Sequence, residues 1–93
     1  MRSSREILEI LQRAMPELAR DFHVTRLALF GSYARGQQTE ASDVDILVEV
    51  DPLFVDLAER IESLLGMHAD VVSRRAITPR HWAVIEEELV DVA

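Results

Sequence analysis

The chain reads Phe-Gly-Ser-Tyr-Ala-Arg-Gly at residues 30–36 and Ser-Asp-Val-Asp at residues 42–45, and these two stretches decide its fold. The first ends a short apolar run, residues 26–30, which predicts a buried strand that stops at Gly31. The second opens a stretch rich in valine and isoleucine, residues 43–50, which predicts a second strand. A helical turn and a polar loop are expected to connect the two strands.

The corner formed by Gly31 and Ser32 has the features of a phosphate site. Gly31 allows close approach to the backbone, and Ser32 adds a hydroxyl where a helical turn over residues 32–38 is expected to start. The amide groups and the dipole at a helix N-terminus favour anions. Arg35 is a candidate phosphate contact, although an ion pair with a nearby carboxylate explains it equally well. Taken alone, Gly-Ser before a helix is more often a plain tight turn.

Two carboxylates, Asp43 and Asp45, strengthen the phosphate interpretation. Residues two apart in a strand project from the same face, so these side chains are expected side by side. Their charges repel, and burying them near a sheet costs several kcal/mol unless a cation neutralises them. Mg²⁺ fits because it takes oxygen ligands, retains waters and shares its coordination sphere with substrate phosphates. The alternative is that both side chains are solvated at the start of the strand.

Asp70 is the candidate for a third carboxylate. It precedes Val71 and Val72 in a third expected strand, within residues 67–73. If this strand lies beside the second, three carboxylates can hold two metal ions and clamp a nucleoside triphosphate. Asp70 could then also accept the proton of an attacking hydroxyl. If the strands are apart, Asp70 is a solvent-facing residue at a sheet edge.

Helical patterns flank these strands. Ser3 and Glu6 have capping-box spacing before a helix expected over residues 4–14, and Pro16 predicts the start of a second short helix that ends at Arg20.

A later helical stripe over residues 54–65 is followed by Gly66 as a cap. Thr78 and Pro79 predict the start of a last helix that runs to about Glu88. The side chains that this helix is expected to bury are Trp82, Ile85 and Leu89. Residues 90–93 are expected to add a short edge strand.

This order of elements predicts one α/β (α+β) domain over residues 1–93, a small mixed β-sheet backed by helices. The chain has 17 acidic and 10 basic residues, all of them arginine, and a net charge of −7. This balance argues against direct nucleic-acid binding, because that depends on basic residues that neutralise phosphates. No apolar run approaches a membrane span or follows the N-terminus as a signal peptide would, and cysteine is absent. A cytoplasmic location is the default expectation.

Several conspicuous side chains are expected to have structural roles. His23, His68 and His81 show no metal-ligand spacing, so each is expected at the surface or in packing. Tyr33 is expected to pack rather than to line a nucleotide site. Trp82 is expected to anchor the last helix rather than to stack on a base.

Residues 31–36 together with 42–45 resemble the GS-x-x-x-G…(S/P)-D-x-D signature of the DNA polymerase β nucleotidyltransferase superfamily. Nearly the whole chain resembles the minimal nucleotidyltransferases, or MNT proteins, within that superfamily. The resemblance implies a polymerase β-type fold. It also implies that the motifs belong to one active site that binds ATP.

By this resemblance, two Mg²⁺ ions are held by Asp43, Asp45 and Asp70, and the triphosphate of ATP is contacted by Gly31 and Ser32. MNT proteins are commonly the antitoxins of toxin–antitoxin pairs in which the toxin is a HEPN-domain ribonuclease. Their characterised activity is the transfer of AMP from ATP to a tyrosine hydroxyl of that toxin, which silences it. The resemblance therefore implies a Mg²⁺-dependent protein adenylyltransferase with a HEPN toxin as its partner.

Two alternatives stay open at this point. The chain could be an antitoxin that neutralises its partner by binding alone, or a transferase that acts on a small molecule or an RNA end. A chain of 93 residues has no length left for an acceptor-binding domain, which favours an acceptor on a partner protein.

Overall fold

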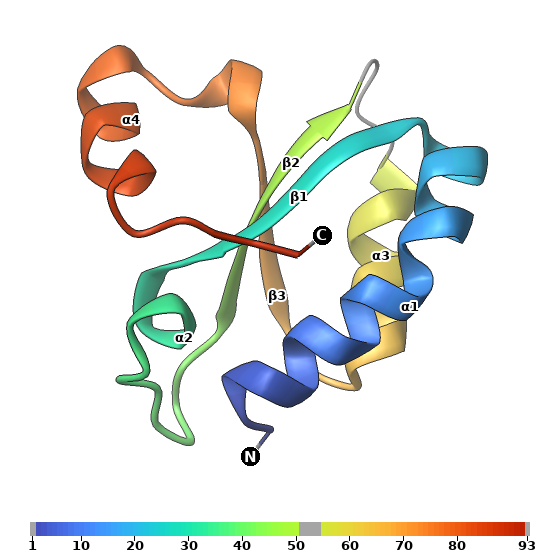
Figure 1. Cartoon of the computed structure of the whole chain (residues 1–93), viewed down its shortest axis with the longest axis horizontal. Coiled ribbons are helices and arrows are strands. Elements are labelled where there is room, and N and C mark those ends of the chain that lie inside the picture. The colour runs from blue at the N-terminus through green and yellow to red at the C-terminus, as the bar shows by residue number, and fades with distance from the viewer. Residues whose placement is uncertain (1, 51–54, 93) are drawn as a thin grey trace.

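The computed structural model describes residues 2–50 and 55–92, which form a mixed four-stranded sheet with helices on both sides (Figure 1). The elements in chain order are α1 (Ser4–Phe22), β1 (Val24–Phe30), α2 (Gly31–Arg35), β2 (Val44–Val50), α3 (Val55–Leu65), β3 (Ala69–Ser73), a 3₁₀ turn (Arg74–Ala76), α4 (Pro79–Glu86) and β4 (Val90–Asp91). The strand order is β3-β2-β1-β4; β2 and β3 are parallel, and the other neighbouring pairs are antiparallel. The predicted fold class, a small mixed sheet backed by helices, is confirmed.

Helix α1 begins with the predicted capping box. The Ser3 hydroxyl accepts the Glu6 amide at 3.1 Å, and the Glu6 carboxylate accepts the Ser3 amide at 3.2 Å. The helix then continues through Pro16 to Phe22, so the prediction of two helices separated at the proline is wrong. Pro16 removes one backbone hydrogen bond, but a single apolar stripe runs past it on both sides, and its burial outweighs that loss. The buried residues of this stripe are Ile7, Leu11, Ala14 and Leu18.

Helices α1 and α3 lie side by side on one face of the sheet and close the main core (Figure 1). From α3, Leu57 and Ile61 are fully buried and Leu64 partly so, whereas Phe54 of the predicted stripe lies outside the described residues. Gly66 ends α3 in the left-handed conformation, as predicted. The strand β2 turns one set of alternate residues into this core: Val44, Ile46, Val48 and Val50.

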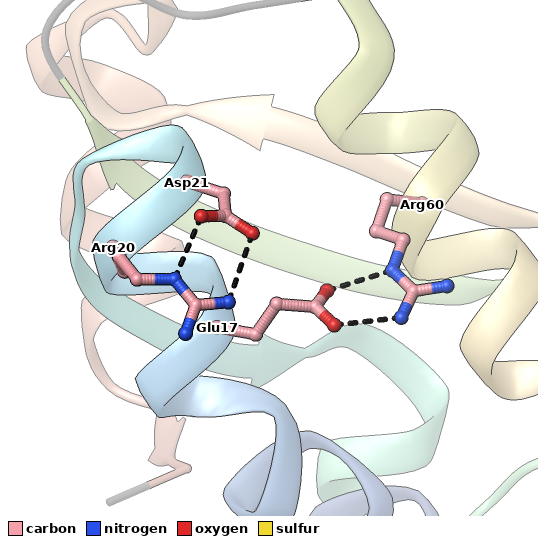
Figure 2. A network of polar contacts seen from close by, with 4 residues as sticks. All are labelled: Glu17, Arg20, Asp21 and Arg60. Carbon is pink, nitrogen blue, oxygen red and sulfur yellow. Dashed lines mark hydrogen bonds and ion pairs between the residues drawn. The ribbon is translucent and has the colours of Figure 1, made fainter.

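A bidentate ion pair also links α1 to α3 (Figure 2). Arg60 donates from Nε and Nη2 to the two carboxylate oxygens of Glu17, each at 2.7 Å. The pKa of Glu17 is lowered, chiefly by this hydrogen bonding from Arg60. Next to it, Arg20 and Asp21 pair within α1 (Figure 2). No helix among the described residues has both the length and the apolar content needed to cross a bilayer.

Helix α4 lies on the opposite side of the sheet from α1 and α3 (Figure 1). It begins as predicted, with Pro79 in the first turn and the Thr78 hydroxyl accepting the His81 amide at 3.3 Å. It ends at Glu86, two residues before the expected end, which is the usual uncertainty of a helix boundary.

The packing of this C-terminal part differs from the prediction. Trp82, Ile85 and Leu89 are only partly buried, so their expected burial is wrong. The Trp82 ring is instead covered by the Arg74 guanidinium, which stacks 3.9 Å from its centroid. The expected edge strand is present as β4, which pairs with β1 through Val90 and Asp91, while Ala93 lies outside the described residues.

Candidate active site

The strand register brings both motifs to one end of the sheet. Phe30, the last residue of β1, is opposite Asp45 on the antiparallel strand β2. Asp45 is in turn opposite Asp70 on the parallel strand β3. The condition under which Asp70 could join the other carboxylates, that its strand neighbours the second, is therefore met. Phe30, Asp45 and Asp70 form a row across three strands, and Gly31 follows Phe30 at the start of α2.

The contact between Gly31 and Asp45 is unusually close. Gly31 has φ +73°, and a Cβ at this position would lie 3.0 Å from Asp45 Cγ and would overlap a carboxylate oxygen. Only glycine avoids both the left-handed strain and this overlap. The short helix α2 then starts at Gly31 and ends at Gly36, whose amide bonds to the carbonyl of Ser32. The corner thus has the tight geometry that the Gly-Ser pair predicted, with Asp45 packed directly against it.

An unexpected carboxylate also contacts the corner. Glu88, which follows α4, accepts the Gly31 amide at 2.9 Å and the Arg35 guanidinium at 2.7 Å. Of the two explanations for Arg35, the structure therefore contains the ion pair. Nothing in the acidic run 86–88 distinguishes Glu88 from its neighbours before the fold is known. The contact shows that the Gly31 amide is directed toward an anionic group.

Beside the Gly31–Asp45 contact lies a second group of possible metal ligands. Single ligand atoms of Asp43, His68 and Asp70 all lie within 4.8 Å of one another, and all three side chains are exposed. His68 Nε2 lies 3.3 Å from Asp70 Oδ1, and Nδ1 lies 2.7 Å from Glu62 Oε2. The carboxylate oxygens of this end of the sheet are the donor type that Mg²⁺ prefers.

The crowding of carboxylates alters their acid–base behaviour. The pKa of Asp45 is raised, first because burial disfavours its charge and then because negative groups surround it. The groups that contribute are Asp70, Asp43 and Glu88, and Arg35 acts in the opposite direction. The pKa of His68 is also raised, chiefly by its hydrogen bond with Glu62. An end of the sheet with this charge distribution attracts cations.

His68 is a second side chain whose surroundings the sequence did not reveal. It is at the surface, as expected, but it lies within the carboxylate group rather than apart from it. The sequence feature that could have indicated this position is the spacing of His68 and Asp70. They are two residues apart, as Asp43 and Asp45 are. Tyr33, by contrast, is buried as expected, with its hydroxyl 4.0 Å from the Met67 sulfur.

Comparisons with known proteins agree with this geometry. Residues 5–92 match the model of the nucleotidyltransferase domain family. A candidate protein adenylyltransferase of Methanocaldococcus jannaschii is 42% identical over 100 residues, which cover 99% of this chain and 100% of the relative. A structure described as a candidate minimal nucleotidyltransferase superposes with a TM-score of 0.79 at 31% identity, covering 96% of this chain and 95% of that one. A crystal structure of a toxin–antitoxin with AMP-PNP gives a TM-score of 0.71 at 26% identity, covering 88% of this chain and 72% of that chain.

A mixed sheet with a Gly-Ser corner and carboxylates at the facing strand ends defines an enzyme class, the nucleotidyltransferases. The chain belongs to the nucleotidyltransferase domain family and, within the DNA polymerase β-like superfamily, to its minimal members.

Proposed function

We propose that this nucleotidyltransferase transfers AMP from ATP to a tyrosine hydroxyl of a partner protein, a HEPN-type ribonuclease toxin, for which it is the antitoxin. The observation that carries the proposal is the strand register that sets Asp45 opposite Asp70, with Gly31 packed against Asp45 and Asp43 close to Asp70. Similarity over the whole length of a candidate protein adenylyltransferase supports a protein acceptor. Similarity to a toxin–antitoxin structure with a nucleotide analogue supports both the ATP and the partner. Residues 1–93 would act as one catalytic domain, in the cytoplasm where ATP is present.

We assign the carboxylates of Asp43, Asp45 and Asp70 to two Mg²⁺ ions. When bound, these ions would neutralise the triphosphate and stabilise the charge that develops during displacement. The raised pKa of Asp45 supports the assignment, because a carboxylate crowded by others is stabilised in its charged form by a cation.

We assign the binding of the triphosphate to Gly31, Ser32 and Arg35. In this proposal the phosphate oxygens accept hydrogen bonds from the Gly31 amide and the Arg35 guanidinium. They replace the Glu88 carboxylate, which accepts from both groups in this structure. The acceptor oxygen attacks the α-phosphorus of ATP, a new P–O bond forms, and the bond to the departing pyrophosphate breaks. Asp70 accepts the proton of the hydroxyl.

The proposal is tested with ATP labelled at the α-phosphate, Mg²⁺ and the partner protein that co-purifies with the chain. We expect label on the partner with the wild type and a loss of about 10³-fold or more with Asp43→Asn/Asp45→Asn, because electrostatic groups of an active site contribute on that order. Asp56→Asn is the matched control, since Asp56 is an exposed aspartate in the first turn of α3.

Three outcomes would redirect the proposal. Silencing of the partner that survives in Asp43→Asn/Asp45→Asn, without label, indicates an antitoxin that acts by binding alone. Label on an RNA end or a small molecule changes the acceptor but keeps the transferase. Label on a partner residue other than tyrosine corrects the acceptor residue.

A further inference from the structure

We infer that His68 is a positioning residue for the cation site, a role that rests on the function proposed above. Its ring stands between carboxylates from two elements. Nδ1 lies 2.7 Å from Glu62 Oε2 on α3, and Nε2 lies 3.3 Å from Asp70 Oδ1 on β3. The ring therefore connects the helical layer to the third candidate ligand.

Glu62 is well placed to fix the orientation of this ring. Its Oε2 accepts the Ala69 amide at 3.2 Å in addition to the His68 ring, so the carboxylate is held from two sides. Its own carbonyl accepts the Gly66 amide at 2.8 Å at the end of α3. Both carboxylates accept from the ring in its protonated form, Glu62 from Nδ1–H and Asp70 from Nε2–H. Outer-shell hydrogen bonds of this kind orient metal-binding groups and are worth 10- to 100-fold in metal affinity.

Asp70 needs such support more than Asp45 does. Asp45 is partly buried and packed against Gly31, whereas the Asp70 side chain is 54% exposed. An exposed carboxylate loses rotamer freedom when it binds a cation, and a neighbour that already restricts it reduces that loss. The backbone supports the arrangement, because the His68 carbonyl accepts the Val44 amide at 3.4 Å. This bond ties His68 to the start of β2, next to Asp43.

The test compares two substitutions of His68 by amide residues, each of which keeps a polar group near the position of one ring nitrogen. The amide of His68→Asn can replace Nδ1 and still reach Glu62, but it falls short of Asp70. The amide of His68→Gln can replace Nε2 and still reach Asp70. His81→Gln is the matched control, because His81 is exposed on α4, on the other side of the sheet from α1 and α3.

Binding of Mn²⁺ alone to the full chain is measured from the loss of the free-ion electron paramagnetic resonance signal. We expect His68→Asn to weaken binding about tenfold, and His68→Gln and His81→Gln to stay within about threefold of the wild type. Glu62→Gln should weaken binding a few-fold and add nothing to His68→Asn, because both act through one ring. In the labelling assay, His68→Asn should raise the half-saturating Mg²⁺ concentration about tenfold, with a smaller change in rate at saturating Mg²⁺.

Thermal unfolding of each variant separates these effects from a loss of fold. Unchanged or tighter Mn²⁺ binding by His68→Asn, with the wild type binding normally, overturns the role of His68 alone. Equal weakening by His68→Asn and His68→Gln also overturns it, because reach to Asp70 would then not matter. If the wild type and Asp43→Asn/Asp45→Asn both fail to bind Mn²⁺, the cation site itself fails, and the inference falls with it.

Discussion

The two faces of the sheet are covered very differently. On one face, α1 and α3 bury six side chains with no exposed area: Ile7, Leu11, Leu18, Leu57, Ile61 and Leu65. On the other face, α4 has no buried residue, and Val84 on it is 65% exposed. The candidate ligands Asp45 and Asp70 are on strands whose opposite faces pack against α1 and α3.

This difference separates stability from chemistry. Apolar burial on the α1–α3 side stabilises the fold. This stabilisation offsets the repulsion between the carboxylates at the end of the sheet. Substitutions on the covered face should therefore lower stability, whereas substitutions at the site should lower activity or relieve the repulsion.

The largest effect on stability is expected from Leu11→Ala on the covered face. Leu11 is fully buried in α1, and its truncation removes apolar contacts and leaves a cavity. We expect the free energy of unfolding to fall by about 2–5 kcal/mol, measured by urea denaturation. Val84→Ala on α4 is the matched control and should stay within about 0.5 kcal/mol of the wild type. Similar losses from the two truncations would contradict the difference between the faces.

The next effect is expected from Gly31→Ala, which breaks the site rather than the core. The added Cβ would meet the Asp45 carboxylate, and a left-handed alanine is strained by about 1–2 kcal/mol. Displacement of Asp45 should reduce label transfer about 100-fold, because small misplacements of catalytic groups have effects of that size.

Gly36→Ala controls for the backbone strain. Gly36 has φ +69°, but a Cβ there meets nothing within 4 Å. Gly36→Ala should therefore lose about as much stability from backbone strain as Gly31→Ala does, while it keeps most of the transfer activity. If Gly36→Ala inactivates the protein as strongly as Gly31→Ala does, the contact with Asp45 is not the cause.

A smaller effect of opposite sign is expected from Asp45→Asn without divalent cations. The pKa of Asp45 is raised in the folded protein, so the charged form is disfavoured there and lowers stability at neutral pH. We expect the melting temperature to rise by about 2–4 °C at pH 7 in the presence of a chelator. Since the cost exists only while Asp45 is ionised, the gain should vanish as the pH falls below 3.8, the ordinary value for aspartate. A gain that persists in acid, or a loss at pH 7, would contradict the repulsion.

The sequence predicted the fold because its local signals agree with the packing. The strand of valine and isoleucine at residues 43–50, the capping box at Ser3, and the caps at Gly66 and Thr78 are each local, and each is confirmed. At Pro16 a local signal failed, since the buried stripe on both sides of the proline was stronger than its missing hydrogen bond.

The candidate site was predictable only to the extent that it depends on strand spacing. Asp43 and Asp45 are linked by the spacing of one strand, and Asp70 requires only that two strands be neighbours. Glu88 reaches Gly31 across 57 positions in the chain, and Glu62 reaches His68 from a helix. Such contacts depend on tertiary placement, which neither residue type nor local periodicity encodes.

The smallest effect is expected from the ion pair that joins α1 and α3 on the covered face (Figure 2). Arg60→Gln removes the bidentate contact with Glu17. The side chains of Arg60 and Glu17 are 40% and 32% exposed, so solvent limits the contribution of this ion pair to stability. We expect the melting temperature to fall by about 1–2 °C at pH 7 and low salt. Arg20→Gln is the control, because its more exposed pair with Asp21 should contribute less.

The pH dependence of the Arg60→Gln effect has a definite sign. The pKa of Glu17 is lowered in the folded protein, so the pair contributes its stability above 4.5, the ordinary value for glutamate, and loses it as the pH falls through the folded value. The difference between the wild type and Arg60→Gln should therefore be constant near neutrality and disappear in acid. Asp45→Asn and Arg60→Gln thus change the melting temperature in opposite directions at pH 7, and both differences vanish at low pH. A difference for Arg60→Gln that survives full protonation of Glu17 would mean that Arg60 stabilises the α1–α3 contact by apolar packing of its stem rather than by charge.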